Sequence, residues 1–328
     1  MTGSPRPSED ELIARFFAPL AGEAGLGLKD DAACLRPAPG HDLVLTVDGL
    51  VVGGHFLPGD RPASIARKAL AVNVSDLAAK GAEPVGFLLT IALTDDWTEA
   101  WMTGFSEGLA KAAEVFRCPL LGGDTVRANG PLWLSITALG QVPAGRMVQR
   151  GGGRPGDRIC VTGTIGDAAL GLALRRGDSA AWTSSLSRGE QDYLVDRYLH
   201  PRPRLAIAGA LREHASAAMD VSDGLAGDLA KMMRAGGTAA SVDLAAVPLS
   251  PAARTALASD PGLLDLLVTG GDDYEILCAI PNDRLASFLT AASGAATVIG
   301  TVQEGEGLPV FRHGTGERRY ERGSYSHF

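Results

Sequence analysis

The chain has 328 residues, of which 45% are hydrophobic, with a formal net charge of −8 and a pI near 5.3. This length and apolar content are sufficient for two ordinary domains with cores of their own, and they are not typical of a disordered chain. The acidic balance excludes the clustered basic surface that binds nucleic acid or an anionic membrane. An anionic substrate stays compatible with this charge if metal ions bridge it to the protein.

Cysteine usage and the first residues bear on the cellular compartment. The cysteines are widely spaced and form no CxxC pair, so we expect Cys34, Cys118, Cys160 and Cys278 to be reduced and buried. The start, MTGSPRPSEDE, lacks a basic-then-apolar signal pattern, and no stretch of roughly 18 apolar residues occurs. These features predict a cytoplasmic protein.

The first half of the chain mixes helical and strand patterns. Ser8 followed by Glu11 is typical of a capping box, which predicts a helix that runs to about Leu20. An Ala- and Leu-rich run followed by Gly81 predicts a helix with a glycine stop. We therefore expect helices at 62–79 and 98–115, and strands at 42–47, 86–93, 118–121 and 132–140.

A change of composition divides the chain. The Gly- and Pro-rich segment 150–157, RGGGRPGD, predicts a boundary between domains at 1–149 and 150–328. The second half repeats the order of strand, Asp/Gly turn and helix, so the predicted fold class is α+β, with mixed sheets flanked by helices in two similar domains. There we expect helices at 165–175 and 223–234, a rigid connector at 200–204, and strands at 158–162, 215–219, 264–269, 274–280 and 296–300.

Aspartates follow many of the short apolar runs, nearly all beside Gly, Ser or Thr. A solvated acidic face would mix Glu with Asp and alternate both with Lys. Carboxylates that converge at strand ends repel one another and raise one another's pKa unless cations neutralise them. Because carboxylate oxygens suit Mg²⁺, the pattern predicts a magnesium and phosphate site. Its members are Asp30, Asp31, Asp48, Asp76, Asp124, Asp220, Asp223, Asp272 and Asp273.

Two glycine-containing motifs are the best candidates for phosphate contact. In DVSDG, Asp220 and Asp223 are three apart at a predicted strand-to-helix junction, where Ser222 could cap the helix and free N–H groups could meet an anion. An ordinary N-cap explains Ser222 but leaves Asp220 without a role. In Gly122-Gly123-Asp124-Thr125, the glycines allow close approach of backbone to a ligand, although such a motif alone is more often a tight turn.

Single polar residues leave alternatives open. Asp76 lies one turn after Asn73 on a predicted helix, where both are either solvated or directed toward the acids of the preceding strand. His55, after a glycine pair, is at least as often structural as functional. Arg150 either clamps a phosphate or is an exposed linker charge.

Common phosphate signatures are missing from the sequence. It contains no GxxxxGK[ST] loop, no HRD or DFG kinase set and no HExxH zinc motif. Phosphoryl transfer by this chain would therefore depend on magnesium held by carboxylates.

Motifs along almost the whole chain resemble those of the thiamine-monophosphate kinase family. They are KDDAACL at 29–35, TVDGLVVGGHF at 46–56, RKALAVNVSDLAAKGAEP at 67–84, GGDTV at 122–126, RPGDRICVTGTIGDAALGL at 154–172, MDVSDGLAGDL at 219–229, GGDDYEI at 270–276 and the closing SHF. The resemblance implies two AIR-synthase-like domains, a homodimer joined through N-terminal sheets, and ATP-dependent conversion of thiamine monophosphate to thiamine diphosphate.

The resemblance also implies roles for particular residues. Gly123, Asp124, Arg150 and Ser222 fall where the family contacts ATP, and His55, Asp272 and Tyr320 fall where it contacts the thiamine substrate. Lys29 replaces a glycine that usually precedes the paired Asp, and Asp272 stands where a longer Glu is common. The positions that resemble magnesium ligands are Asp31, Thr46, Asp48, Asp76, Asp124, Asp220 and Asp223.

The implied mechanism is direct in-line transfer assisted by magnesium. The acceptor is already a charged phosphate oxygen, so the reaction needs no covalent intermediate and no general base. Two alternatives stay open at this point. Another AIR-synthase-like ATP-dependent enzyme would share the Asp and Gly framework, and a non-catalytic metal or nucleotide sensor would bind without turnover.

Overall fold

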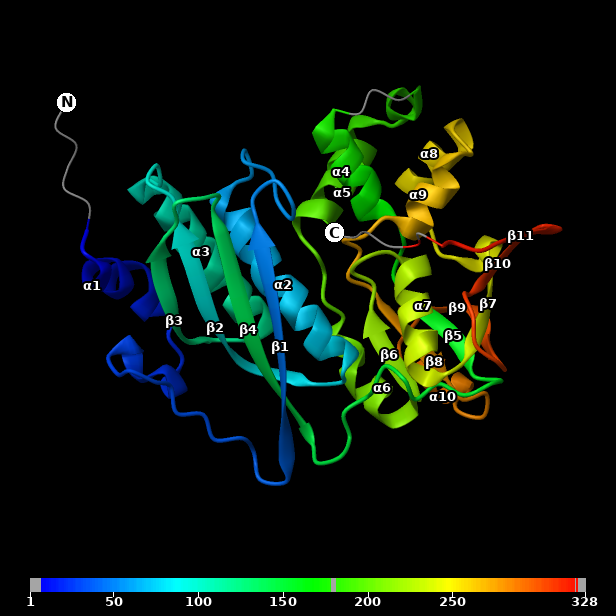
Figure 1. The fold of residues 1–328 in the computed structure, drawn as a ribbon, viewed down its shortest axis with the longest axis horizontal. Coiled ribbons are helices and arrows are strands. Elements are labelled where there is room, and N and C mark those ends of the chain that lie inside the picture. The colour runs from blue at the N-terminus through cyan, green and yellow to red at the C-terminus, as the bar shows by residue number, and fades with distance from the viewer. Residues whose placement is uncertain (1–6, 178–180, 322, 324–328) are drawn as a thin grey trace. The chain divides into compact units, whose positions relative to one another are not determined.

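The computed structural model describes residues 7–177, 181–321 and 323. The chain forms two compact units, which we describe separately: the first unit contains residues 1–77 and 83–145, and the second contains 78–82 and 146–328. Each unit combines a mixed sheet with helices (Figure 1), so the predicted α+β class is confirmed. Among the described residues, no helix combines the length and the apolar character needed to cross a membrane.

The sheet of the first unit has the strand order β1-β4-β2-β3, and Figure 1 shows α2 and α3 on one of its faces. β2 and β3 are parallel, whereas β1 and β2 both pair antiparallel with β4. The strands are β1 (His41–Val51), β2 (Glu83–Leu93), β3 (Leu120–Arg127) and β4 (Trp133–Pro143), and the helices are α1 (Glu9–Leu12), α2 (Pro62–Ala79) and α3 (Glu99–Phe116).

Alternation along these strands gives the sheet two different faces. On β1, Val44 and Leu50 are buried on the face toward α2, whereas Leu45 and Val47 are each 62% exposed on the other face. We call this second side the open sheet face. It displays the exposed apolar side chains Leu43, Leu45, Val47, Leu88, Val126 and Trp133.

Most predictions for the first unit are confirmed, with corrections at its edges. The Ser8–Glu11 capping box is present, but regular α-helix ends at Leu12 and continues only as irregular helical turns to Leu20. The predicted helix at 62–79 coincides with α2. β3 begins at Leu120 and runs to Arg127, so the Gly-Gly-Asp motif lies inside a strand and not in a turn after it.

The sheet of the second unit has the order β11-β10-β7-β9-β5-β8-β6. Its strands are β5 (Arg158–Thr162), β6 (Ala217–Asp220), β7 (Ala239–Asp243), β8 (Ile276–Ile280), β9 (Ala296–Gln303), β10 (Val310–His313) and β11 (Gly316–Arg318). Its helices are α4 (Asp167–Arg176), α5 (Arg188–Leu199), α6 (Ala208–His214), α7 (Leu225–Gly236), α8 (Pro251–Ser259), α9 (Leu263–Thr269) and α10 (Leu285–Ala291).

Both faces of this second sheet are buried. Ile159 and Met219 pack with the apolar side of α7, and Cys160 and Cys278 pack on the opposite face with residues of α6 and α10. The prediction of buried, reduced cysteines holds for Cys118, Cys160 and Cys278. Cys34 is also a free cysteine, but its predicted burial is wrong: it is exposed because it lies in an extended segment outside the helices and strands.

The predicted strand at 264–269 is wrong, because this segment is helix α9. Its buried residues are Leu263, Leu264, Leu267 and Val268, a spacing of one helical turn and not the alternation of a strand. Val268 and Thr269 are its only β-branched residues, so the apolar content alone was misleading. The predictions at 165–175 and 223–234 correspond to α4 and α7, and 158–162 coincides with β5.

A buried carboxylate stabilises the start of α4. The helix begins after Gly166, which offers no capping side chain, and Oδ2 of Asp273 accepts the Gly166 N–H at 2.8 Å. Burial raises the pKa of Asp273 well above its usual range, and the nearby Asp167 adds to the rise, against the lowering effect of the Gly166 N–H. The folded chain therefore holds a proton on Asp273 more tightly than the unfolded chain does.

We predict that Asp273→Asn becomes increasingly stable relative to wild type as the pH rises. Since the folded-state pKa is raised, wild-type stability falls as the pH rises above the unfolded-state value of about 4, and the amide has no proton to lose. Urea unfolding of both proteins at several pH values between about 5 and 8 measures the difference. A difference that stays constant across this range would contradict the prediction.

Candidate functional site

On the helix side of the first sheet, α2 contacts the middle of β1. Oγ1 of Thr46 donates to Oδ2 of Asp76 at 2.5 Å, and the backbone N–H of Asp48 donates to Oδ1 of Asn73 at 3.0 Å. Asn73 is fully buried and also donates to the Ala69 carbonyl at 3.0 Å. The structure thus favours the interpretation in which Asn73 and Asp76 face the preceding strand, and it brings Thr46, Asp48 and Asp76 together.

A cavity of about 760 Å³ lies on the open sheet face of the first unit. Asp30 and Asp31 line it from the segment before β1, and Asp124 lines it from β3. Thr90, which pairs with Asp124 across the ladder, contributes a hydroxyl to the same wall. The cavity therefore brings Asp31, Gly123 and Asp124 into one setting.

Gly123 has a structural reason to be glycine. A Cβ atom at this position would lie 1.8 Å from the carbonyl oxygen of Leu89 on β2. The absence of a side chain is therefore required by strand pairing, whether or not a ligand approaches.

The acids of the first unit divide between the two faces of its sheet. Asp48 is on the side of α2, whereas Asp124 shares the open face with Leu88. Within the described residues, no three His, Cys, Asp or Glu side chains are grouped so that they could hold one metal ion. The sequence suggested a single cluster of carboxylates, but neither unit by itself forms such a cluster among the described residues.

In the second unit, the junction of β6 and α7 carries Asp220, Ser222 and Asp223. The predicted helix cap by Ser222 is wrong, because α7 begins after Gly224 and has no side-chain cap. The backbone N–H groups of Ser222 and Asp223 both donate to Oδ2 of Asp228 at 2.9 Å. These two N–H groups already have a partner, so any anion would have to meet the helix start at 225–227 instead.

Asp228 and Lys231 were missed by the sequence analysis. Asp228 is fully buried, which raises its pKa against the lowering effect of Lys231. The Lys231 ammonium contacts the carboxylates of Asp223 and Asp228 and neutralises part of their charge. A signal existed, since Asp228 falls on the buried stripe of α7 with Leu225 and Met232, where an acid needs a partner.

The Gly270–Glu275 segment lies directly beside this junction. The N–H of Asp272 donates to the Ser222 carbonyl and the N–H of Tyr274 donates to the Val221 carbonyl, both at 2.8 Å. A Cβ atom at Gly271 would lie 2.4 Å from the Ser222 oxygen. The structure therefore brings Ser222, Asp223 and Asp272 together.

Arg150 does not lie beside Ser222. The next residue, Gly151, packs against the Ala235 carbonyl, where an added Cβ atom would be 2.4 Å away. Ala235 is at the end of α7, so the two predicted ATP contacts are near opposite ends of a helix that is about 18 Å long. In the first unit, Nδ1 of His55 accepts the Val51 N–H at 3.1 Å, which ties this ring to its own loop.

Tyr320 packs on the second unit's core. Its ring meets Phe311 edge-on with centroids 5.2 Å apart, and its hydroxyl donates to Oδ1 of Asp265 at 2.8 Å. Burial and the Asp265 carboxylate raise the pKa of Tyr320 to about 12. The close approach of Gly323 to Gly227 places this tail at the start of α7. The closing SHF motif at 326–328 is outside the described residues.

We predict that Asp228→Ala lowers the free energy of unfolding by roughly 2–5 kcal/mol, because it leaves the two half-buried N–H groups of Ser222 and Asp223 without their carboxylate partner. The matched control is Asp243→Ala: this exposed carboxylate accepts one N–H, from Ala245 at 2.9 Å. Its loss should cost about 1 kcal/mol. Urea unfolding measures both, and equal losses would show that Asp228 does not hold the junction.

Comparison with known proteins agrees with this organisation. Residues 29–142 match the family model of the AIR synthase related protein N-terminal domain, and residues 154–312 match that of the C-terminal domain. The thiamine-monophosphate kinase of Caulobacter vibrioides is 42% identical over 316 residues, which cover 94% of this chain and 88% of that protein.

Solved structures give the same result. The thiamine-monophosphate kinase of Stenotrophomonas maltophilia is 38% identical with a TM-score of 0.78, covering 86% of this chain and 89% of that one. A structure of AaThiL complexed with AMPPCP and TMP is 28% identical with a TM-score of 0.75, covering 97% of this chain and 100% of that one. The two-domain AIR-synthase-like fold is thus confirmed, and the chain belongs to the thiamine-monophosphate kinase family.

Proposed function

We propose that this chain transfers the terminal phosphoryl group of ATP to thiamine monophosphate, giving ADP and thiamine diphosphate in thiamine biosynthesis. The observation that carries the proposal is the 42% identity to a thiamine-monophosphate kinase over 94% of the chain. The structure of AaThiL with AMPPCP and TMP supports the same pair of substrates.

The proposed ATP contacts are Gly123 and Asp124 in the first unit and Ser222 in the second. The volume of about 760 Å³ beside Asp124 is within the range of small-molecule and cofactor sites. Arg150, which precedes the Gly151 that packs beside the end of α7, is a further proposed ATP contact. The proposed contacts of thiamine monophosphate are His55, Asp272 and Tyr320.

Magnesium is the proposed cofactor, and the donor chemistry fits it. The predicted ligands offer carboxylate and hydroxyl oxygens, as Mg²⁺ prefers, and Thr46 and Asp76 already place two of these oxygens 2.5 Å apart. When bound, Mg²⁺ neutralises phosphate charge and orients the reacting groups. The proposed ligands are Asp31, Thr46, Asp48, Asp76, Asp124, Asp220 and Asp223.

The chain's own contribution to the reaction is positioning. Asn73 holds the backbone of Asp48, and Asp228 holds the backbone of Ser222 and Asp223, so the acids keep their places without rearrangement. The acceptor oxygen is already anionic, so no side chain has to remove a proton. We therefore propose direct in-line transfer without a catalytic base.

We predict that the purified protein releases ADP and forms thiamine diphosphate only when ATP, Mg²⁺ and thiamine monophosphate are all present, and that EDTA stops the reaction. Asp48→Asn and Asp220→Asn should each lower kcat by at least about a hundredfold, since a lost metal ligand removes several kcal/mol of transition-state stabilisation. Coupled ADP assays and chromatography of the thiamine products measure both effects.

Asp42→Asn is the matched control, because Asp42 is an exposed acid on the same strand as Asp48 and its carboxylate accepts only the N–H of Gly145, in the turn after β4, in the described contacts. It should keep kcat within about twofold of wild type. Full turnover in excess chelator would exclude the magnesium mechanism. ATP binding without ADP release for any phosphate acceptor would favour a sensor instead.

The open sheet face supports the proposed homodimer. Leu45, Val47 and Leu88 form part of an exposed apolar surface, which is unusual on a protein that works alone. A two-fold symmetric dimer would bury this apolar surface against the same face of a second copy and so remove it from water. A cytoplasmic location stays part of this proposal.

We predict that Leu45→Glu converts the dimer into monomers, because it places a charge among the exposed apolar side chains of this face. Light scattering after size-exclusion chromatography measures the mass. Leu266→Glu is the control, since Leu266 is exposed on α9 of the second unit. A wild-type protein that is monomeric at micromolar concentration would refute the dimer, as would a dimer unaffected by Leu45→Glu.

A further inference from the structure

The segment that carries Asp272 alternates between two directions. Asp273 and Glu275 are buried at 1% and 0% exposure, whereas Asp272 and Tyr274 are only half-buried. Their N–H groups bind the carbonyls of Ser222 and Val221, so this side of the segment follows the β6–α7 junction. The buried side chains of Asp273 and Glu275 therefore anchor the segment to the interior of the second unit.

Glu275 is held by groups from three separate places in the chain. Nη2 of Arg197 on α5 donates to Oε1 at 2.9 Å, and Nε of Arg204 donates to Oε2 at 2.5 Å. The hydroxyl of Thr162, at the end of β5, donates to the same Oε2 at 2.7 Å. A fully buried carboxylate needs such partners, because an unpaired one is costly to bury.

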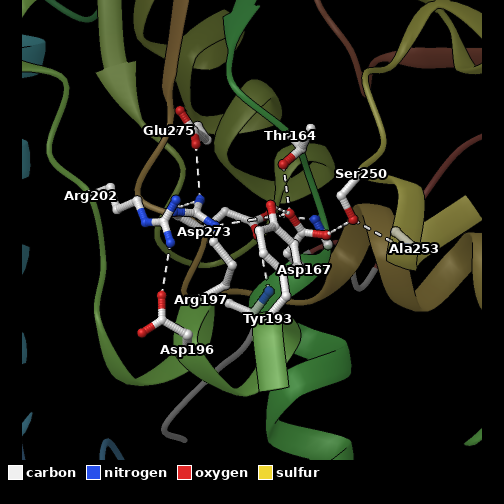
Figure 2. Close-up of polar contacts among 12 residues, drawn as sticks. Thr164, Asp167, Tyr193, Asp196, Arg197, Arg202, Ser250, Ala253, Asp273 and Glu275 are labelled. Atoms are coloured by element: carbon white, nitrogen blue, oxygen red, sulfur yellow. Dashed lines mark hydrogen bonds and ion pairs between the residues drawn. The ribbon is translucent and has the colours of Figure 1, made fainter. Parts of the chain in front are cut away.

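Arg197 is the member that connects the network (Figure 2). Besides Glu275, it contacts the backbone carbonyl of Asp273 at 3.4 Å and the carboxylate of Asp167 at 3.9 Å. The Asp167 carboxylate in turn accepts hydroxyls from Tyr193 at 3.0 Å and Ser250 at 2.5 Å. One buried guanidinium thus links α4 and α5 to both inward residues of the Asp272 segment.

The backbone angles of this segment also indicate that contacts with the rest of the unit hold it in shape. Asp272 has φ +71° and Tyr274 has φ +51°, a region that bulky residues rarely adopt. Such conformations persist where the surrounding structure over-determines them, and they concentrate at functional sites. The inward anchors at Asp273 and Glu275 are the residues that impose this shape.

We infer that Arg197 is a positioning residue for the reaction, which holds Asp272 and Tyr274 in place through Glu275 and the Asp273 backbone. The role of Asp272 as a substrate contact rests on the proposed function, whereas the anchoring does not. Arg197 is remote from the reacting groups in this assignment and acts only by fixing the geometry of the segment. The N–H groups of Ser222 and Asp223 have a separate anchor in Asp228, so the effect of Arg197 should fall on thiamine monophosphate more than on ATP.

The test uses Glu275→Gln, which keeps the shape of the anchor but removes its charge, together with Arg197→Lys. Amide hydrogen exchange at Asp272 and Tyr274 should accelerate by about tenfold or more, while exchange in α10 stays unchanged. KM for thiamine monophosphate should rise about tenfold with less than a twofold change in KM for ATP, because a small displacement of a contact weakens one substrate only. A thermal melt checks that each variant is folded.

Arg202→Met is the matched control, because the Arg202 guanidinium pairs only with the exposed Asp196 among the described contacts, at 2.8 Å (Figure 2). It should leave both exchange and KM as in wild type. If Glu275→Gln does not fold, Arg204→Met replaces it as the test variant. The Arg204 side chain is partly exposed, and its substitution removes one partner of Glu275, so exchange at Asp272 and KM for thiamine monophosphate should both rise.

Folded variants with wild-type exchange at Asp272, or with equal changes in both KM values, would overturn the inference. Failure of the proposed function is distinguishable from this, because wild-type protein would then show no turnover. The exchange experiment would still report on the anchor in that case.

Discussion

The second unit depends on the burial of Glu275 between two arginines. Its carboxylate binds Arg197 on α5, Arg204 in the connector that follows α5, and Thr162 at the end of β5, which is distant from both in the sequence. Since a buried charge without partners costs several kcal/mol, these elements must assemble together or not at all. The segment at Asp272 is held by this anchor, and its backbone in turn pairs with the β6–α7 junction, from Asp272 to Ser222 and from Tyr274 to Val221.

The same logic of pairing applies to Asp228 and Asn73. Each is a buried polar side chain whose partners are backbone N–H groups of a residue proposed to bind ligand, Ser222 and Asp223 for the one and Asp48 for the other. Neither presents its own polar atoms to a substrate in this arrangement. Asp228 and Asn73 therefore position the proposed ligand-binding residues, although neither would be counted among the residues that contact a ligand.

How much could be predicted from the sequence depends on the range of the interaction concerned. The helix at 62–79 and the strand at 158–162 were predicted to the residue, because local composition and a glycine stop decide them. The strand predicted at 264–269 was wrong because apolar content was weighed above the helical spacing of Leu263, Leu267 and Val268. The cap by Ser222 was wrong because α7 begins only after Gly224, and the Ser222 and Asp223 N–H groups bind Asp228, whose place on the buried stripe of α7 the sequence analysis overlooked.

The alternation of side chains between the two faces of a sheet explains why the acids do not form the single cluster that the sequence suggested. β1 pairs with β4, which pairs with β2 and through it with β3, so the face of every residue follows from the register. The register across β1, β4, β2 and β3 puts Asp48 on the side of α2 and Asp124 on the open sheet face. The aspartates were visible in the sequence, but the side of the sheet that Asp124 occupies depends on a bulge between Phe87 and Leu88 that shifts β3 by one residue. Because such a shift reverses the face of every residue beyond it, motifs alone place Asp124 near a strand and only the register places it in the cavity.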